Sequence, residues 1–155
     1  ELVLRALPGL PDTRLLLVGA GPDGDRLAAL AHNLGVADRV VFLGSVDHDL
    51  LPLILSTSNA MVLPSASEGL ANAWVEALAC GTPIIIADVG GARELVRGAA
   101  AGLIVAREPE AIAKAVRTVL DQPRAPRETA RVVAGFGWAE HAEALDRIYS
   151  EIVGR

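Results

Sequence analysis

The chain is poor in the residues on which several classes of protein depend. Its 155 residues include one cysteine, Cys80, with two Phe, two Trp and one Tyr, and its formal net charge is −5. A single cysteine excludes an internal disulfide and a cysteine-rich zinc site. An acidic chain with few aromatic side chains is also poorly suited to nucleic acid, which calls for basic patches and stacking rings. We therefore expect no nucleic-acid partner.

Long apolar runs are absent as well. No run reaches the roughly 18 apolar residues that cross a membrane, so no transmembrane segment is expected. No charged start, apolar segment and cleavage pattern opens the chain, which predicts no signal peptide. His32, His48 and His141 are scattered without ligand spacing, which favours surface positions over a metal site. Hydrophobic residues nevertheless make up 52% of the chain, which is enough for one domain with its own core.

Short apolar runs alternate with amphipathic segments along the chain. The runs predict strands at residues 14–19, 39–44, 60–63, 83–87 and 102–105, and helical spacing predicts helices at 23–34, 47–58, 71–79, 91–97 and 108–120. A break at residues 122–127 precedes the last helices, so that residues 123–155 form a C-terminal helical segment. The alternation predicts an α/β fold with a Rossmann-like, doubly wound parallel sheet. Ligands of such a sheet bind beyond the carboxyl ends of its strands.

Glycine follows two of the predicted strands at that end. Gly19-Ala20-Gly21-Pro22 comes after the first strand and Gly44-Ser45-Val46 after the second. Glycine lets the backbone approach a ligand closely. Pro22 and Asp23 replace the spacing of a dinucleotide-binding fingerprint, so a tight strand-to-helix turn stays open as the structural interpretation.

Two glutamates, with seven residues between them, mark the centre of the chain. Glu68 lies just before a predicted apolar helix, and Glu76 lies within it. Nearly every other side chain from Ala71 to Ala79 is apolar or small, which predicts a helix buried on most sides. A carboxylate there is costly unless a partner or ligand satisfies it. For a lone glutamate, the commoner explanation is structural: it lies on a narrow solvent-facing stripe or caps neighbouring backbone. The neighbouring residues decide between this explanation and ligand binding.

The first turn of this helix offers free backbone N–H groups and the positive end of the helix dipole. Such a terminus favours an anion, for example a diphosphate.

The neighbouring residues complete an ordered motif. It comprises Pro64-Ser65, Glu68-Gly69, Glu76 and the run Ala77-Leu78-Ala79-Cys80-Gly81-Thr82-Pro83, placed between two apolar strands. The combination resembles the donor-site signature of retaining, nucleotide-sugar-dependent glycosyltransferases of group 1 type, which carry a Glu-x7-Glu motif and have the two-domain GT-B architecture. The resemblance extends from about Leu2 to Tyr149, and it implies that the chain is the C-terminal, donor-binding domain of such an enzyme.

The resemblance implies specific roles for these residues. The amides of Gly69, Leu70, Ala71, Asn72 and Ala73 would contact the sugar and phosphates of the donor. Glu76 would accept hydrogen bonds from the two ribose hydroxyls, which suits a carboxylate with two oxygens. Glu68 would hold the transferred sugar as a catalytic-site residue without a bond-making role. Gly19 and Gly21 would line the donor site, and Val46 would lie beside the base.

The implied reaction transfers a sugar from a nucleoside diphosphate to an acceptor with retention of the anomeric configuration. Members of this architecture generally need no bound metal, so the nucleotide-sugar is expected as donor substrate and no cofactor is expected. The donor base, the sugar and the acceptor depend on a few loop contacts and on an absent domain, and they stay open.

The chain also departs from the family pattern. An Arg and a Lys that neutralise the diphosphate are expected shortly before Glu1, whereas the only lysine here, Lys114, falls on a late amphipathic helix at the surface. Leu70-Ala71 replaces a frequent aromatic–glycine pair. We therefore expect a fragment, inactive by itself, that lacks the basic pair, the N-terminal acceptor domain and a strand near the middle of the sheet. Such a fragment would leave a gap, rearrange, or fill the position from a neighbouring molecule.

The tail also fits the resemblance. Residues 136–149 are similar to the closing helix that crosses toward the N-terminal domain. Trp138, Ala142, Leu145, Ile148 and Tyr149 stand at roughly helical spacing, and core packing is their expected role.

The whole enzyme is expected to transfer a hexose or a related sugar in the cytoplasm, during polysaccharide or glycolipid assembly, with peripheral membrane contact left open. A non-catalytic nucleotide-sugar-binding or regulatory domain is the alternative. A third hypothesis is an unrelated doubly wound domain, such as a flavodoxin-like receiver or a redox module. A receiver needs an acidic cluster where Gly19-Ala20-Gly21 stands, and the glutamate motif argues against both.

Overall fold

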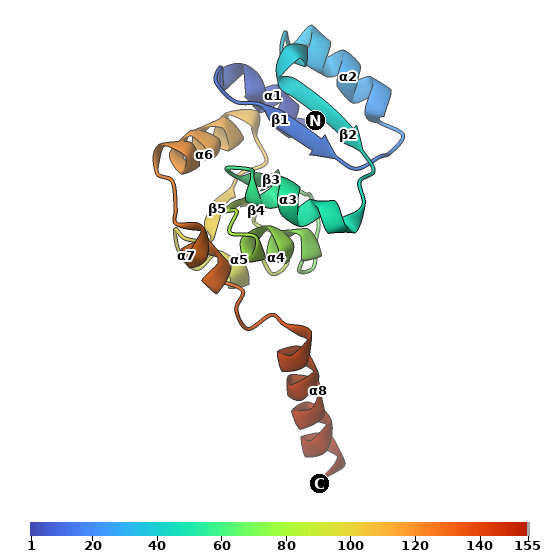
Figure 1. Cartoon of the computed structure of the whole chain (residues 1–155), viewed down its shortest axis with the longest axis vertical. Coiled ribbons are helices and arrows are strands. Elements are labelled where there is room, and N and C mark those ends of the chain that lie inside the picture. The colour runs from blue at the N-terminus through green and yellow to red at the C-terminus, as the bar shows by residue number, and fades with distance from the viewer. Residues whose placement is uncertain (155) are drawn as a thin grey trace.

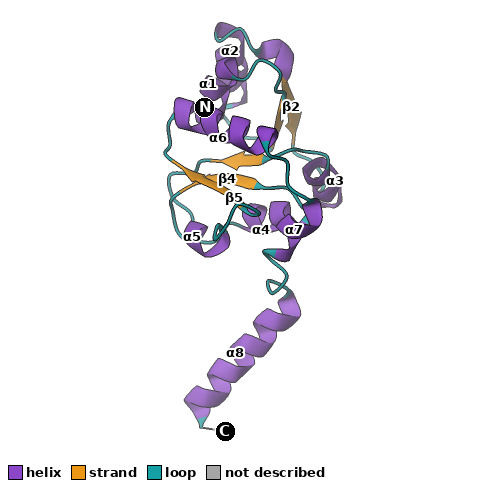
Figure 2. Ribbon diagram, turned by 90° about the vertical axis from the view of Figure 1, so that its left-hand side faces the viewer, coloured by secondary structure: helices purple, strands orange, loops and turns teal. Residues whose placement is uncertain are grey.

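A computed structural model describes residues 1–154 as an α/β fold whose strands lie in two separate parallel sheets (Figures 1 and 2). In one sheet, β1 (Leu15–Val18) pairs with β2 (Val40–Gly44). In the other, β4 (Ile84–Ala87) lies between β3 (Met61–Leu63) and β5 (Gly102–Val105). Every predicted strand forms within one residue of its expected bounds, and the predicted parallel pairing is confirmed. The sheet is interrupted between β1 and β3, which is one of the outcomes expected above, because among residues 1–154 no strand pairs with both of them.

Helices connect the strands and flank both sheets. They are α1 (Leu2–Ala6), α2 (Gly24–Asn33), α3 (Leu51–Ser56), α4 (Asn72–Ala79), α5 (Ala92–Leu95), α6 (Pro109–Asp121), α7 (Pro126–Arg131) and α8 (Trp138–Val153), with short 3-10 turns at η1 (Leu7–Gly9), η2 (Ala37–Arg39) and η3 (His48–Leu50). Proline stands in the first turn of α3, α6 and α7, where its missing N–H costs nothing. The helix predicted at 47–58 forms as the turn η3 followed by the shorter α3.

Two apolar clusters separate the faces of the fold. The first apolar cluster joins α1, α2 and α6, and it contains Leu4, Leu7 and Ile85. The second apolar cluster joins α4, α5 and the side chains of α3 and of the segment after α7, and it contains Ile84 and Ile86. Because side chains alternate along a strand, the three successive isoleucines of β4 reach both clusters. Helices thus cover both faces, as a doubly wound fold requires.

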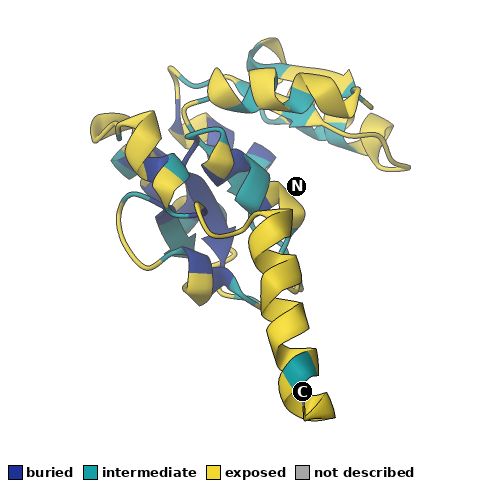
Figure 3. Ribbon diagram, turned by 60° about the horizontal axis from the view of Figure 1, so that its bottom comes forward, coloured by how far each residue is buried: buried dark blue, intermediate teal, exposed yellow. Residues whose placement is uncertain are grey.

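Helix α8 projects away from the rest of the molecule (Figures 1 and 3). The prediction that its apolar stripe joins the core is wrong. Trp138 is 89% exposed, and Ala142, Leu145, Ile148 and Tyr149 are exposed as well. The stripe has the helical spacing that favours burial, but no part of residues 1–154 lies over it.

Other surface predictions are confirmed, because His32, His48, His141 and Lys114 are all exposed. Of the helices within the described residues, none is long and apolar enough to span a membrane.

Candidate functional site

The N-terminus of α4 lies directly after the loop that carries Glu68. Ala71 is the N-cap residue in extended conformation, and Trp74 N–H donates to its carbonyl at 3.0 Å. No side chain caps this terminus, and the first turn holds no acidic residue. Asn72 and Ala73 are exposed, so their amides face solvent at the positive end of the helix dipole. This end of α4 has the electrostatic character of an anion-binding site.

One face of α4 fixes the helix in the protein. Trp74, Ala77 and Leu78 are fully buried in the second apolar cluster. Glu76 lies beside this face and is partly buried, and within residues 1–154 its carboxylate makes no side-chain hydrogen bond or ion pair. Burial and the Glu76 charge together raise the pKa of the Cys80 thiol, one turn further along the helix. Glu76 is therefore a partly buried residue whose carboxylate has no protein partner and is free to accept hydrogen bonds from a ligand.

The loop of residues 68–70 rests on two glycines that follow β4. Gly91 N–H donates to the Gly69 carbonyl at 2.8 Å. Gly90 has φ +49°, and a Cβ there would collide with the carbonyl oxygens of Glu68 and Gly69. These glycines therefore set the backbone beside Glu68. This role was not predicted, although glycines shortly after a predicted strand are the same signal that singled out Gly19 and Gly21.

Two arginines also follow strands of the three-stranded sheet at this edge, Arg107 in the loop after β5 and Arg93 in α5 after β4. Arg107, two residues after β5, donates from Nε to the Pro64 carbonyl at 3.0 Å and so holds the start of the Glu68 loop. Arg93 forms a bidentate ion pair with Asp88, at 2.8 Å from Nε and 2.5 Å from Nη2. This pairing lowers the pKa of Asp88. Sequence reasoning did not single out either arginine.

The predicted glycine loops lie in the other sheet. Gly19 N–H donates to the Gly44 carbonyl at 2.8 Å, and both residues have positive φ, +118° and +64°. The structure thus brings the loops of Gly19 and Gly21 together with the Gly44–Val46 turn, where Val46 is half-buried. Among the described residues, no hydrogen bond joins these loops to residues 68–76. The predicted site residues therefore form two groups, the glycine loops (19–21 and 44–46) and the glutamate segment (68–76).

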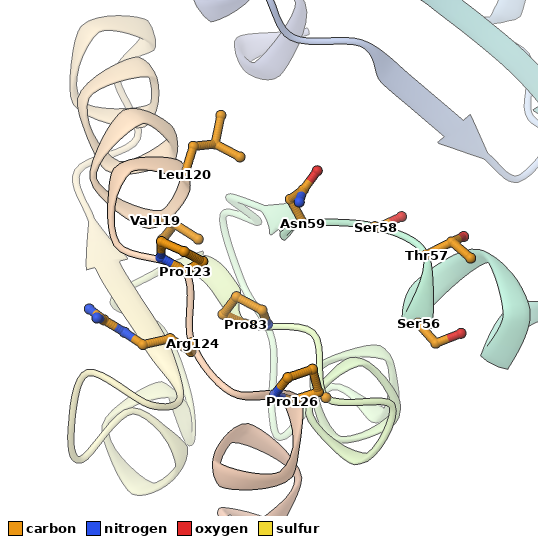
Figure 4. A pocket seen from close by; sticks show the side chains of 11 residues that line it. Ser56, Thr57, Ser58, Asn59, Pro83, Val119, Leu120, Pro123, Arg124 and Pro126 are labelled. Carbon is orange, nitrogen blue, oxygen red and sulfur yellow. The ribbon is translucent and has the colours of Figure 1, made fainter.

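A pocket of about 220 Å³ lies elsewhere (Figure 4). Its lining includes Asn59, two residues before β3, and Pro83, directly before β4, together with Ser58 and Arg124. The pocket therefore opens at the amino ends of these strands, opposite the glutamate segment, and no predicted site residue lines it. Over residues 1–154, no cluster of three His, Cys, Asp or Glu side chains is arranged to hold a metal ion.

Comparison with known proteins gives one family. Residues 1–133 match the family model described as glycosyl transferases group 1. Among curated proteins, the chain is 36% identical over 151 residues to a GDP-mannose-dependent alpha-(1-6)-phosphatidylinositol monomannoside mannosyltransferase of Mycolicibacterium smegmatis, with 90% of this chain and 39% of that protein covered. It is also 36% identical to a D-inositol 3-phosphate glycosyltransferase of the same organism, with 97% of this chain and 36% of that protein covered. The chain thus spans somewhat more than a third of the length of these relatives.

Solved structures agree with this result. Sucrose-phosphate synthase from Thermosynechococcus elongatus superimposes with a TM-score of 0.86 at 31% identity, over 99% of this chain and 42% of that one. Anabaena HepE in complex with UDP-glucose superimposes with a TM-score of 0.72 at 28% identity, over 93% of this chain and 39% of that one.

Proposed function

The chain belongs to the group 1 glycosyltransferases, and from this premise we propose that it is the donor-binding half of an enzyme that transfers a sugar from a nucleotide-sugar to an acceptor with retention of configuration. The observation that carries the proposal is the pairing of an uncapped, exposed α4 N-terminus with the half-buried, unpartnered Glu76 on the same helix. The similar Anabaena structure, which holds UDP-glucose, supports a nucleotide-sugar as the ligand.

The α4 N-terminus and Glu76 bind different parts of the donor. The diphosphate lies at the α4 N-terminus, where the amides of Asn72 and Ala73 donate to its oxygens. Glu76, one turn further along, accepts hydrogen bonds from the neighbouring ribose hydroxyls.

The reacting end of the donor lies toward Glu68. During transfer, the bond from the anomeric carbon to the diphosphate oxygen and the O–H bond of the acceptor break, a bond from the anomeric carbon to the acceptor oxygen forms, and the leaving diphosphate takes up the proton. Negative charge grows on the leaving diphosphate, and the helix amides stabilise it most when it is greatest, which lowers the barrier. Glu68 positions the sugar through its hydroxyls. Its backbone is held on both sides, by Gly90-Gly91 beneath it and by Arg107 at Pro64. We propose that this reaction proceeds without a bound metal.

The wider role is also a proposal. The acceptor would bind to an N-terminal domain of the longer protein, and transfer would take place in the cytoplasm during glycolipid or polysaccharide assembly. The similar Mycolicibacterium smegmatis protein is a phosphatidylinositol monomannoside mannosyltransferase, which supports the glycolipid form of this proposal.

Calorimetric titration with UDP, GDP and ADP, and with their sugars, tests donor binding. We expect one nucleotide to bind in preference to the other two. We also expect Glu76→Ala to weaken its binding roughly tenfold or more, because a charge-assisted hydrogen-bond acceptor for two hydroxyls is lost. Glu110→Ala, which removes an exposed glutamate in the first turn of α6, is the matched control and should leave the affinity unchanged.

The same titration is then repeated on a longer chain that includes the gene-encoded residues before Glu1. This second titration distinguishes the enzyme, the non-catalytic binding domain and an unrelated domain. If the extended protein ignores all three nucleotides, the proposed function is wrong. If the full-length protein binds a nucleotide-sugar but neither transfers the sugar to any acceptor nor hydrolyses the nucleotide-sugar, the protein is a non-catalytic binding domain.

A further inference from the structure

The loop that carries Glu68, residues 64–71, connects β3 to α4 without regular secondary structure. Among the described residues, no N–H group of this loop donates to a backbone carbonyl. The loop is instead held through its own carbonyl oxygens, at Gly69 by a backbone amide and at Pro64 by the side chain of Arg107. The position of Glu68 therefore depends on contacts from segments that are distant in the sequence.

Arg107 projects from a well-fixed segment of backbone. It lies between β5, whose ladder with β4 ends at Val105, and α6, a 13-residue helix whose N-cap residue is Glu108. Glu108 N–H donates to the Ala106 carbonyl at 2.8 Å, which closes a tight turn around Arg107. Because a strand and a helix fix its backbone on both sides, Arg107 can hold a neighbouring loop with little movement of its own.

The side chain of Arg107 crosses the carboxyl end of β4 to reach the loop. In the sheet, β4 lies between β3 and β5. Pro64 directly follows β3, whereas Arg107 comes two residues after β5. The hydrogen bond from Arg107 Nε to the Pro64 carbonyl, at 3.0 Å, therefore ties the loops of the two outer strands together. The tie lies at the edge where ligands of such a sheet bind.

This hydrogen bond matters more for the loop than for the stability of the fold. Arg107 is exposed, and it packs in neither apolar cluster. A hydrogen bond at such a position contributes little to the free energy of unfolding. Helix α4 is anchored separately by its buried face, through Trp74, Ala77 and Leu78. Loss of the Arg107 contact therefore loosens the loop around Glu68 and leaves the α4 N-terminus in place.

We propose that Arg107 is a positioning residue for sugar transfer, an inference that rests on the proposed function. Arg107 acts through the Pro64 carbonyl on the loop, and so sets the place of the Glu68 carboxylate beside the transferred sugar. A small misplacement of such a group lowers the rate of reaction. The nucleoside diphosphate is held by the α4 N-terminus and Glu76, so its affinity does not depend on Arg107.

Two substitutions separate the hydrogen bond from the charge. Glutamine Nε2 lies the same number of bonds from Cα as arginine Nε, so Arg107→Gln keeps a donor for Pro64 without the positive charge, whereas Arg107→Ala keeps neither. The probes are UDP-glucose and GDP-mannose, with the full-length encoded protein. Release of UDP or GDP should slow roughly tenfold or more in Arg107→Ala, and Arg107→Gln should recover most of that loss. The Kd of UDP or GDP, measured by titration, should stay the same in both variants.

Arg97→Ala is the matched control, because it removes an exposed arginine that makes no hydrogen bond among the described residues. It should change neither the rate nor the Kd. Release from Arg107→Ala at the wild-type rate would overturn the proposal. A rate in Arg107→Gln as low as in Arg107→Ala would overturn it as well, because the charge and not the hydrogen bond would then be needed.

An NMR measurement without nucleotide distinguishes this proposal from the proposed function. The Pro64 carbonyl and the Ser65 N–H share one peptide group, so loss of the hydrogen bond should shift the Ser65 amide resonance. We expect Arg107→Ala to shift the amide resonances of Ser65 and Gly69 and to leave that of Glu76 in place, and Arg107→Gln to restore them.

Unchanged loop resonances in Arg107→Ala would overturn the positioning role even in an active enzyme. A wild-type protein that binds neither UDP nor GDP, and releases neither from its nucleotide-sugar, would instead overturn the proposed function, and the role of Arg107 in transfer with it.

Discussion

The central strand β4 and the β1–β2 pair are built from equally apolar residues, yet they are buried to very different extents. Ile84, Ile85 and Ile86 are completely inaccessible to solvent, whereas Leu16 and Phe42 are each 42% exposed. β4 has a strand on either side and helices on both faces. The β1–β2 pair has its packed helices, α1 and α2, on one face only. The number of neighbours, rather than the hydrophobicity of the strand, therefore determines how much apolar surface leaves water.

This difference implies that the two halves have different local stability. A two-stranded sheet is marginal unless other elements cover it. Here the pair is tied to the helical layer by Arg39, whose guanidinium donates to the carbonyls of Leu7, Leu10 and Thr13 at 3.2, 2.5 and 3.1 Å. The part of the molecule that carries the glutamate segment contains the second apolar cluster, and β4 at its centre has a strand on either side.

The largest expected effect comes from truncating one side chain in each half. Ile85→Ala should destabilise the protein by about 2–5 kcal/mol, because it leaves a cavity in the core. Leu16→Ala should cost about 1 kcal/mol or less, because almost half of that side chain already faces water. Urea denaturation followed by circular dichroism measures both losses. Similar losses would mean that the β1–β2 pair is packed as well as β4, and the contrast between the halves would fail.

A glycine substitution tests how the glutamate segment is supported. Gly90→Ala should cost about 1–3 kcal/mol and displace the Glu68 loop, because of its positive φ and the collision with two carbonyl oxygens. Nucleotide affinity measured by titration should fall with it.

Gly98→Ala is the matched control for this change. Gly98 has no atom within 4 Å of an added Cβ and no positive φ, so stability and binding should stay nearly unchanged. Intact nucleotide binding in Gly90→Ala would show that the loop is not held in this way.

The hydrogen bonds of Arg39, which hold the β1–β2 pair, can be removed separately. Arg39→Ala should cost about 1–2 kcal/mol, because three backbone carbonyls lose a charged donor. Hydrogen exchange should rise in β1 and β2 and stay constant in β4. Arg14→Ala removes an exposed arginine that makes no hydrogen bond among the described residues. This control should change neither the stability of the protein nor the hydrogen exchange of β1 and β2. A uniform rise in exchange would show that the halves unfold together.

The smallest expected effect concerns the charge of Glu76, in the part of the molecule built around β4. Glu76→Gln removes one of the two causes that raise the pKa of the Cys80 thiol, while burial remains. The pKa of the thiol should fall, the thiolate fraction at pH 8 should rise, and alkylation of Cys80 by iodoacetamide should become faster. Glu110→Gln should leave this rate unaltered. A slower reaction in Glu76→Gln would contradict the placement of the carboxylate beside Cys80.

The strands and the α4 helix could be predicted because their signals are local. Apolar runs bounded at one end by glycine or proline set the five strands to within a residue, and the spacing of Trp74, Ala77 and Leu78 set the buried face of α4. The half-buried position of Glu76 followed from its place in that helix. Its role toward a donor, like the roles of Glu68 and Val46, stays a prediction.

The features that were not predicted depend on contacts between segments that are distant in the sequence. The apolar stripe of α8 obeys the same periodicity as a core helix, yet Trp138 lies in solvent. The support of Glu68 by Gly90 and the three carbonyls held by Arg39 join segments distant in sequence. No local pattern encodes such contacts, because they depend on which surfaces meet once the chain has folded.

The sequence by itself determined the elements of this protein, their parallel α/β order and the family motif, since each depends on the spacing of residues within a short segment. Only the tertiary structure decided which of the expected outcomes holds: the strands form two sheets with a gap between β1 and β3, and the predicted site is divided between them. The physical reason is that a strand edge is completed by hydrogen bonds to a neighbouring strand. Within residues 1–154 the edges of β1 and β3 that face each other have no such neighbour.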